Sequence, residues 1–120
     1  MKKILIVDDE PNIVMSLEYT FKKNNYEVFI ARDGQEALDI LKTNYPDVII
    51  LDVMMPMVDG YATLEQIRKD TNLQHTKVMF LSAKNKESDI EKGMALGADA
   101  YLTKPFSIKK VVEKVSELLS

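Results

Sequence analysis

The sequence contains no cysteine and only one histidine, His75. Without cysteine the chain can form neither a disulfide nor a thiolate metal site, and it has no thiol nucleophile. His75 lies in the polar stretch 72–76, and we interpret it as a loop residue rather than a ligand or a base. The first apolar run, residues 4–7, is too short for a signal peptide or a membrane span. We therefore expect a cytoplasmic protein without membrane contact, and a net charge of −3 gives no reason to expect direct nucleic-acid binding.

The composition is that of a globular protein, since 46% of the 120 residues are hydrophobic. A chain of this length can bury a core without disulfides or metals to support it. No repeat, linker or low-complexity segment divides it. We therefore expect one domain over residues 1–120.

Five short apolar runs alternate along the chain with patterns typical of amphipathic helices. The predicted strands are residues 4–7, 28–31, 48–51, 77–81 and 100–102. Four of the predicted helices begin at or just after residues that favour a helix start, namely Pro11, Asp33, Asp59 and Ser107. The remaining helix, the fourth along the chain, begins at about Lys86. Strict alternation of this kind predicts an α/β fold, with a parallel sheet, right-handed crossovers and helices on both faces.

Three details of the helices can be checked against a structure. Asp33 and Glu36 have the spacing of a capping box. The second helix is expected to reach Asn44. The fourth, which Gly93 interrupts, is expected to turn Ile90 and Met94 inward.

Polar side chains follow four of the five predicted strands. Asp8 and Asp9 follow the first, Asp52 the third, Ser82 the fourth and Lys104 the fifth. The carboxyl ends of parallel strands meet at one edge of the sheet, where ligands bind in such folds. Each residue alone could serve as a cap or turn residue, but together they predict a site that contains acids, a hydroxyl and an ammonium group.

The chemistry of this set points to phosphoryl transfer. Crowded carboxylates repel one another unless a cation is present, and oxygen ligands without His or Cys favour a hard cation, Mg²⁺. A carboxylate beside Mg²⁺ and Lys104 can attack phosphorus to give an aspartyl phosphate. Ser82 could donate a hydrogen bond to the acquired phosphoryl group.

Four segments together resemble the receiver domain of two-component response regulators, most closely the chemotaxis-regulator type. They are ILIVDDE at 4–10, VIILDVMMPMVDG at 48–60, LSA at 81–83 and GADAYLTKPF at 97–106. The resemblance spans essentially the whole chain. It implies a flavodoxin-like, doubly wound five-stranded parallel sheet of order 2-1-3-4-5 with five helices.

The resemblance also implies roles for individual residues. Asp52 matches the phosphoacceptor, and Asp9, Asp52 and the backbone carbonyl of Met54 match the Mg²⁺ ligands. Asp8 matches the acid that assists the metal through water, and Lys104 the lysine that contacts phosphate.

Two further residues match the conformational switch of the family, Ser82 as its hydroxyl and Tyr101 as its aromatic ring. The bond Lys104–Pro105 matches a peptide bond that the family holds cis. The implied function is a phosphorylation-dependent signalling switch, in which the phosphoryl group comes from a histidine kinase or a phosphotransfer protein. Phosphorylation would reshape the face of the fourth helix, fifth strand and fifth helix. That face would then bind a downstream effector protein or output domain, with the chain a monomer or a weak dimer through it.

Such a switch is not a turnover enzyme, although it catalyses its own phosphorylation and dephosphorylation on Asp52. Two alternatives stay open. A haloacid-dehalogenase-like Mg²⁺-dependent phosphatase would need an acid two residues after the nucleophile, where this chain has Met54. A degenerate receiver that acts only as an interaction module would be expected to lack Asp52 or Lys104, and both are present. A nucleotide-binding protein is not supported, because neither glycine-rich phosphate-binding motif occurs.

Overall fold

The computed structural model describes all residues from 1 to 120, and it has five parallel strands in one sheet of order β2-β1-β3-β4-β5. The strands are β1 (Lys2–Val7), β2 (Tyr26–Ala31), β3 (Val48–Leu51), β4 (Lys77–Ser82) and β5 (Ala100–Thr103). The helices are α1 (Pro11–Lys23), α2 (Gly34–Ile40), α3 (Gly60–Lys69), the 3₁₀ turn η1 (Thr71–Leu73), α4 (Glu87–Ala95) and α5 (Ile108–Leu119). The flavodoxin-like fold and its strand order are therefore confirmed.

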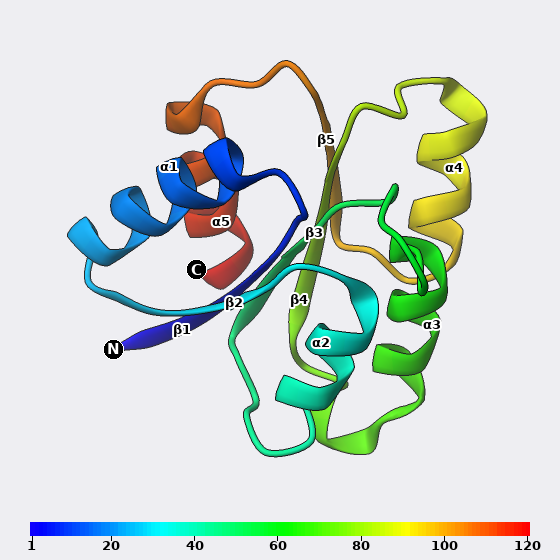
Figure 1. Cartoon of the computed structure of the whole chain (residues 1–120), viewed down its shortest axis with the longest axis horizontal. Helices are drawn as coiled ribbons and strands as arrows, with labels where there is room; N and C mark the ends of the chain where they lie inside the picture. Colours follow the sequence, from blue (N-terminus) through cyan, green and yellow to red (C-terminus); the bar gives the residue numbers. More distant parts are fainter.

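The sheet lies between two layers of helices (Figure 1). Helices α1 and α5 cover one face, where Leu17 and Phe21 pack with Val111 and Val115. Helices α2, α3 and α4 lie on the other face, and α2 and α3 supply most of the buried helical side chains there. Because strand side chains alternate between faces, each central strand contributes to both cores.

The strand β3 has the central place that its apolar run predicts. It pairs with β1 on one side and β4 on the other, and all four of its residues are buried. Val48 and Ile50 pack in one core, whereas Ile49 and Leu51 pack in the other. A continuous apolar run is what a strand buried on both faces requires.

The predicted helix starts are confirmed by their caps. Pro11 is the first residue of α1, and the side chains of Asp33, Asp59 and Ser107 each accept a hydrogen bond from the backbone N–H of the third residue of their helix. The capping box at Asp33 forms only in part, because the Glu36 carboxylate accepts from the backbone of Arg32 instead of that of Asp33. Helix α2 ends at Ile40, earlier than predicted, and turns carry the chain on toward Asn44.

The prediction for the inward face of α4 was wrong at one position. Gly93 is the only buried residue of this helix, and Met94 is 42% exposed. A Cβ atom on residue 93 would lie 3.0 Å from the ring of Phe80 and 3.1 Å from that of Tyr101. The helix therefore comes closest to the sheet at its glycine, and this orientation turns Met94 outward. None of the helices combines the length and the apolar character that crossing a membrane requires.

Candidate functional site

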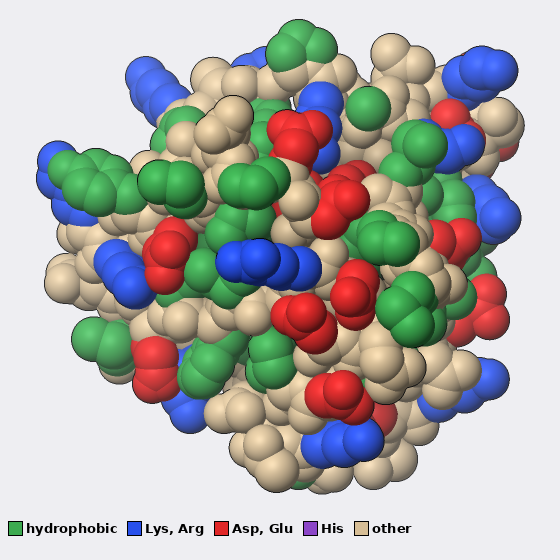
Figure 2. Space-filling view, in the orientation of Figure 1, with side chains coloured by type: hydrophobic (Ala, Val, Ile, Leu, Met, Phe, Trp, Pro, Cys, Tyr) green, Lys and Arg blue, Asp and Glu red, His purple; other side chains and the backbone are tan.

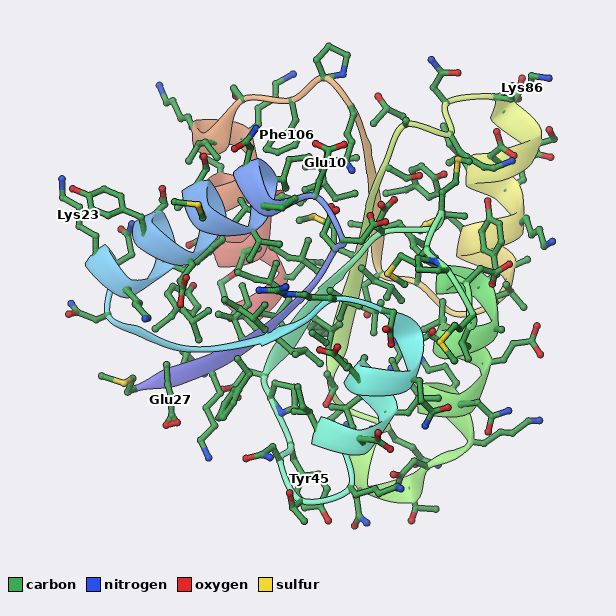
Figure 3. All side chains as sticks on the ribbon, viewed as in Figure 1. Glu10, Lys23, Glu27, Tyr45, Lys86 and Phe106 are labelled. Atoms are coloured by element: carbon green, nitrogen blue, oxygen red, sulfur yellow. The ribbon has the colours of Figure 1, made fainter.

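The predicted site residues meet at the carboxyl edge of the sheet. Asp8 and Asp9 follow β1, Asp52 follows β3, and carboxylate oxygens of these three residues lie within 4.8 Å of one another. Figure 2 shows acidic side chains gathered on the surface above the ends of β1 and β3. Figure 3 labels Glu10, the residue directly after the acidic pair, at the same edge.

The loop after β3 folds back over the end of its own strand. The backbone N–H of Gly60 donates to the carbonyl of Val53 at 2.8 Å. A Cβ atom at residue 60 would clash with the carbonyl oxygen of Asp52, so only glycine allows this approach. The backbone of Asp52 is fixed as well, because its N–H donates to the carbonyl of Val7 at 3.0 Å. The backbone of Asp52 is thereby held in one place, the residue is 5% exposed, and its Oδ1 accepts from the N–H of Met54 at 3.4 Å.

Lys104 is the only cationic side chain within contact distance of these carboxylates. Its Nζ lies 3.1 Å from Oδ2 of Asp8 and 3.5 Å from Oδ2 of Asp52. Burial disfavours the charged form of Lys104, but the charges of Asp52 and Asp8 outweigh this effect and raise its pKa above the ordinary value. The lysine is therefore charged at neutral pH.

Asp52 experiences more repulsion than attraction. Its pKa is raised, first by burial and then by the charge of Asp8, while Lys104 and backbone N–H groups offset part of the effect. Three carboxylates and one ammonium group leave an excess of negative charge at this edge. Such a cluster favours a bound cation or the transfer of an electrophile to one of its oxygens.

The three carboxylates differ in how many hydrogen bonds and ion pairs their oxygens already form within the protein. Asp8 is buried, and its Oδ1 accepts from the backbone of Glu10 at 2.9 Å while its Oδ2 contacts Lys104. Asp9 is exposed and has no hydrogen bond or ion pair within the protein. Asp9 is therefore the acid most available to a ligand from solvent.

Ser82 and Tyr101 meet at the backbone of Lys84, in the loop between β4 and α4. The buried Oγ of Ser82 accepts from the N–H of Lys84 at 3.2 Å, and the hydroxyl of Tyr101 donates to its carbonyl at 2.7 Å. The bond between Lys104 and Pro105 is cis, as the resemblance implies. The structure therefore brings the predicted switch pair together through one loop residue.

A cavity of about 470 Å³ extends from Asp9 toward α4. Its walls include Met54, whose side chain is largely exposed, and Lys84. Tyr61 and Lys92 also line it, and sequence reasoning gave neither of them a role. The available signal for Tyr61 was its position in the first turn of a predicted helix, directly after Gly60 in the loop that follows Asp52.

Comparison with known proteins agrees with this geometry. The sequence profile described as the response regulator receiver domain matches residues 4–116. The alkaline phosphatase synthesis transcriptional regulatory protein PhoP of Bacillus subtilis is 44% identical over 118 residues, which are 98% of this chain and 48% of PhoP. The chain thus spans about half the length of this curated relative.

Two solved structures extend the comparison. The chemotaxis response regulator CheY4 of Vibrio cholerae is 32% identical, with a TM-score of 0.94 and 99% of each chain covered. The receiver domain of the sensor histidine kinase PA1611 of Pseudomonas aeruginosa is 26% identical, with a TM-score of 0.90, and 98% of this chain and 97% of that one are covered. The PA1611 structure has a magnesium ion coordinated in its active-site cleft.

Proposed function

The chain belongs to the response regulator receiver domain family of phosphoacceptor switches, and we propose that Asp52 is the residue that accepts the phosphoryl group. The observation that carries this proposal is the position of Asp52 at the end of the central strand. Its buried carboxylate lies there between a charged lysine and two further carboxylates. The carboxylates of Asp8 and Asp52 both have a partner on each oxygen, but the partners of Asp8 lie at 2.9 and 3.1 Å and those of Asp52 at 3.4 and 3.5 Å. Asp9 is exposed, so neither Asp8 nor Asp9 is as well placed as Asp52 for attack on phosphorus.

Receiver domains bind Mg²⁺ at an acidic site, and the donor set of this chain fits that ion. The candidate ligands are oxygens alone, and they lie close enough together to share one cation. We infer that Asp9, Asp52 and the backbone carbonyl of Met54 hold the ion directly, and that Asp8 assists through a water molecule. When bound, the ion neutralises negative charge on the phosphoryl oxygens.

The protein groups have separate tasks in the transfer. An oxygen of Asp52 attacks phosphorus and forms the new O–P bond, while the P–N bond to the donor imidazole breaks. The imidazole nitrogen keeps the electron pair of the broken bond, and a proton from solvent water completes the neutral imidazole. Lys104 stabilises the charge of the transferring group, because its ammonium already lies 3.5 Å from Asp52. Ser82 then donates a hydrogen bond from its hydroxyl to a phosphoryl oxygen.

The readout is a shift between two packings of α4 and its neighbours. Ser82 moves toward the phosphoryl group and gives up its bond with Lys84. This shifts the population toward the inward position of Tyr101, in which its ring packs on Phe80 and its hydroxyl donates to Lys84, as both do in this structure. The face formed by α4, β5 and α5 then presents a different surface to an effector protein or output domain, or to a second copy in a weak dimer.

Receiver domains act with histidine kinases and output effectors, and this chain is proposed to do the same in the cytoplasm. The donor is the phosphohistidine of a kinase or phosphotransfer protein. Apart from its own phosphorylation and dephosphorylation, no substrate turnover is proposed.

The test is labelling with a small acyl phosphate and Mg²⁺, followed by intact-protein mass measurement. The wild type is expected to gain one phosphoryl group, and Asp52→Asn to gain none. Asp39→Asn, an exposed acid on α2, serves as the control and should be labelled like the wild type. Labelling of Asp52→Asn at the wild-type rate would refute the assignment.

A further inference from the structure

Helix α4 is held on the sheet by little apolar burial. Its only buried residue is Gly93, which has no side chain to pack. The position of the helix therefore depends on specific contacts from neighbouring elements rather than on a broad hydrophobic face.

Two tyrosine hydroxyls supply such contacts, and both bind backbone carbonyls. Tyr101 of β5 donates to Lys84, just before α4, at 2.7 Å. Tyr61 of α3 donates to Asp89, in the first turn of α4, at 3.1 Å. A carbonyl oxygen has two lone pairs, so the bond from Tyr61 is compatible with the hydrogen bonds of the helix itself. Burial raises the pKa of both tyrosines, so both hydroxyls remain protonated donors at neutral pH.

The two tyrosines are also coupled through Phe80. The ring of Phe80 lies 5.5 Å from that of Tyr61, edge to face, and 5.5 Å from that of Tyr101. The ammonium of Lys92 also lies over the ring of Tyr61, 4.6 Å from the ring centre. Because even a Cβ atom at position 93 would crowd Phe80 and Tyr101, α4 cannot move closer to the sheet without displacing these rings.

The backbone of Tyr61 is tied to the proposed phosphoacceptor. Its neighbour Gly60 packs against the carbonyl of Asp52 and donates to that of Val53. Tyr61 therefore connects the end of β3 with the first turn of α4 through a route that includes neither Ser82 nor Tyr101. In Figure 3, Lys86 marks the start of α4; the hydroxyl of Tyr101 binds the loop just before this point, and that of Tyr61 binds the first helical turn after it.

We propose that Tyr61 is a positioning residue for α4. Its hydroxyl fixes the first turn of α4 in the same arrangement that the bond from Tyr101 to Lys84 stabilises, and so strengthens the coupling between Asp52 and the face of α4. The inference rests on the proposed role of Asp52 as phosphoacceptor. Both hydroxyl bonds form in the same arrangement of α4, so loss of either bond destabilises that arrangement. A ligand at Asp52 that favours this arrangement then binds more weakly.

The test compares Tyr61→Phe with the wild type, and it uses Mg²⁺ with beryllofluoride as the phosphoryl analogue. Tyr61→Phe keeps the ring on Phe80 and removes only the hydroxyl. Tyr45→Phe is the matched control, because Tyr45 is 49% exposed and lies at the opposite end of the sheet in Figure 3. Two quantities are measured: amide hydrogen exchange in α4 without ligand, and the Kd for beryllofluoride.

In Tyr61→Phe we expect several-fold faster exchange in α4 with unchanged exchange in α1. We also expect roughly two- to tenfold weaker beryllofluoride binding, the effect of one neutral hydrogen bond. Tyr45→Phe should change neither quantity.

Unchanged α4 exchange in Tyr61→Phe would overturn the proposal. So would faster exchange with unchanged beryllofluoride affinity, because the hydroxyl would then be structural only. The proposed function is tested separately in the same experiment. It would be refuted if the wild type bound no beryllofluoride, or if Asp52→Asn bound it equally well, before any Tyr61 variant is compared.

Discussion

Replacing Asp52 by asparagine is expected to stabilise the fold when divalent cations are absent. Asparagine keeps the size of the side chain and removes its charge. In the wild type that charge is almost fully buried, and burial together with Asp8 raises the pKa of the carboxyl. Lys104 remains paired with Asp8 at 3.1 Å in the variant, so the substitution leaves no lone buried cation.

The size of the effect follows from the distances in the site. At an effective dielectric constant of about 20, opposite charges 3.5 Å apart, as for Asp52 and Lys104, attract by about 5 kcal/mol. One oxygen of Asp52 lies no more than 4.8 Å from an oxygen of Asp8 and from an oxygen of Asp9. At that distance two like charges repel by about 3.5 kcal/mol for each pair. The two repulsions exceed the attraction by about 2 kcal/mol. Allowing for relaxation and salt, we expect Asp52→Asn to raise the free energy of unfolding by about 1–2 kcal/mol, or Tm by roughly 3–8 °C.

The pH dependence has a definite sign. Because the folded-state pKa of Asp52 is raised above 3.8, the native state favours the protonated carboxyl. Below the unfolded-state pKa the wild type therefore keeps the stability that this proton contributes. As pH rises through the folded-state pKa, the wild type loses that contribution and Asp52→Asn does not. The difference in free energy of unfolding between the two proteins should therefore grow as pH rises above about 3.8 and then remain constant toward neutral pH.

Urea and thermal unfolding in EDTA at pH 7 measure this difference directly. Asp39→Asn is the control, because exposed ion pairs such as that of Asp39 with Lys42 contribute little to stability. Added Mg²⁺ should narrow the gap, since it stabilises the protein whose carboxylates bind it. If Asp52→Asn were no more stable than the wild type in EDTA, the assigned repulsion at Asp52 would be wrong.

Three further variants test other parts of the account. Mg²⁺ should raise the Tm of the wild type but not that of Asp9→Ala, a variant that should still fold. The Mg²⁺ affinity of both proteins is measured by titration. Equal affinity in Asp9→Ala would reject Asp9 as a ligand. The purified phosphoprotein should lose its phosphoryl group slowly, because Met54 and Lys84 border the cavity that opens on the site and neither offers an acceptor to orient water. Met54→Asn/Lys84→Glu should decay roughly tenfold faster, and equal decay would show that these positions do not set the lifetime. Arg68→Ala should lower the free energy of unfolding, measured in urea, by about 2–4 kcal/mol. The reason is that Arg68 pairs with Asp99 at 3.0 Å and donates to backbone carbonyls near the start of β4 and the end of α4. A loss below about 1 kcal/mol would contradict this role.

Much of the site could be predicted because it depends on topology rather than on detailed packing. The continuous run of β3 fits only a strand buried on both faces, and strict alternation makes the sheet parallel. Together these features place Asp8, Asp52 and Lys104 at one edge without any knowledge of side-chain conformations. The residues at the strand ends then define the chemistry by their functional groups.

What could not be predicted depends on contacts between distant elements. The orientation of α4 is set by how closely Gly93 approaches Phe80 and Tyr101, and helical periodicity instead favoured Met94 as an inward residue. The role of Tyr61 depends on a hydrogen bond to Asp89, 28 positions further along the chain. No local pattern in the sequence encodes that bond.

The central claim is that Asp52 itself carries the phosphoryl group, and locating the modified residue tests it most directly. The phosphoprotein formed with a small acyl phosphate and Mg²⁺ is treated with borohydride, which reduces an acyl phosphate to the alcohol, and the peptides are sequenced by mass spectrometry. Homoserine is expected at position 52 alone, and only in protein that was first phosphorylated. Homoserine at position 8 or 9 instead, or at no position in a protein that had gained a phosphoryl group, would contradict the assignment.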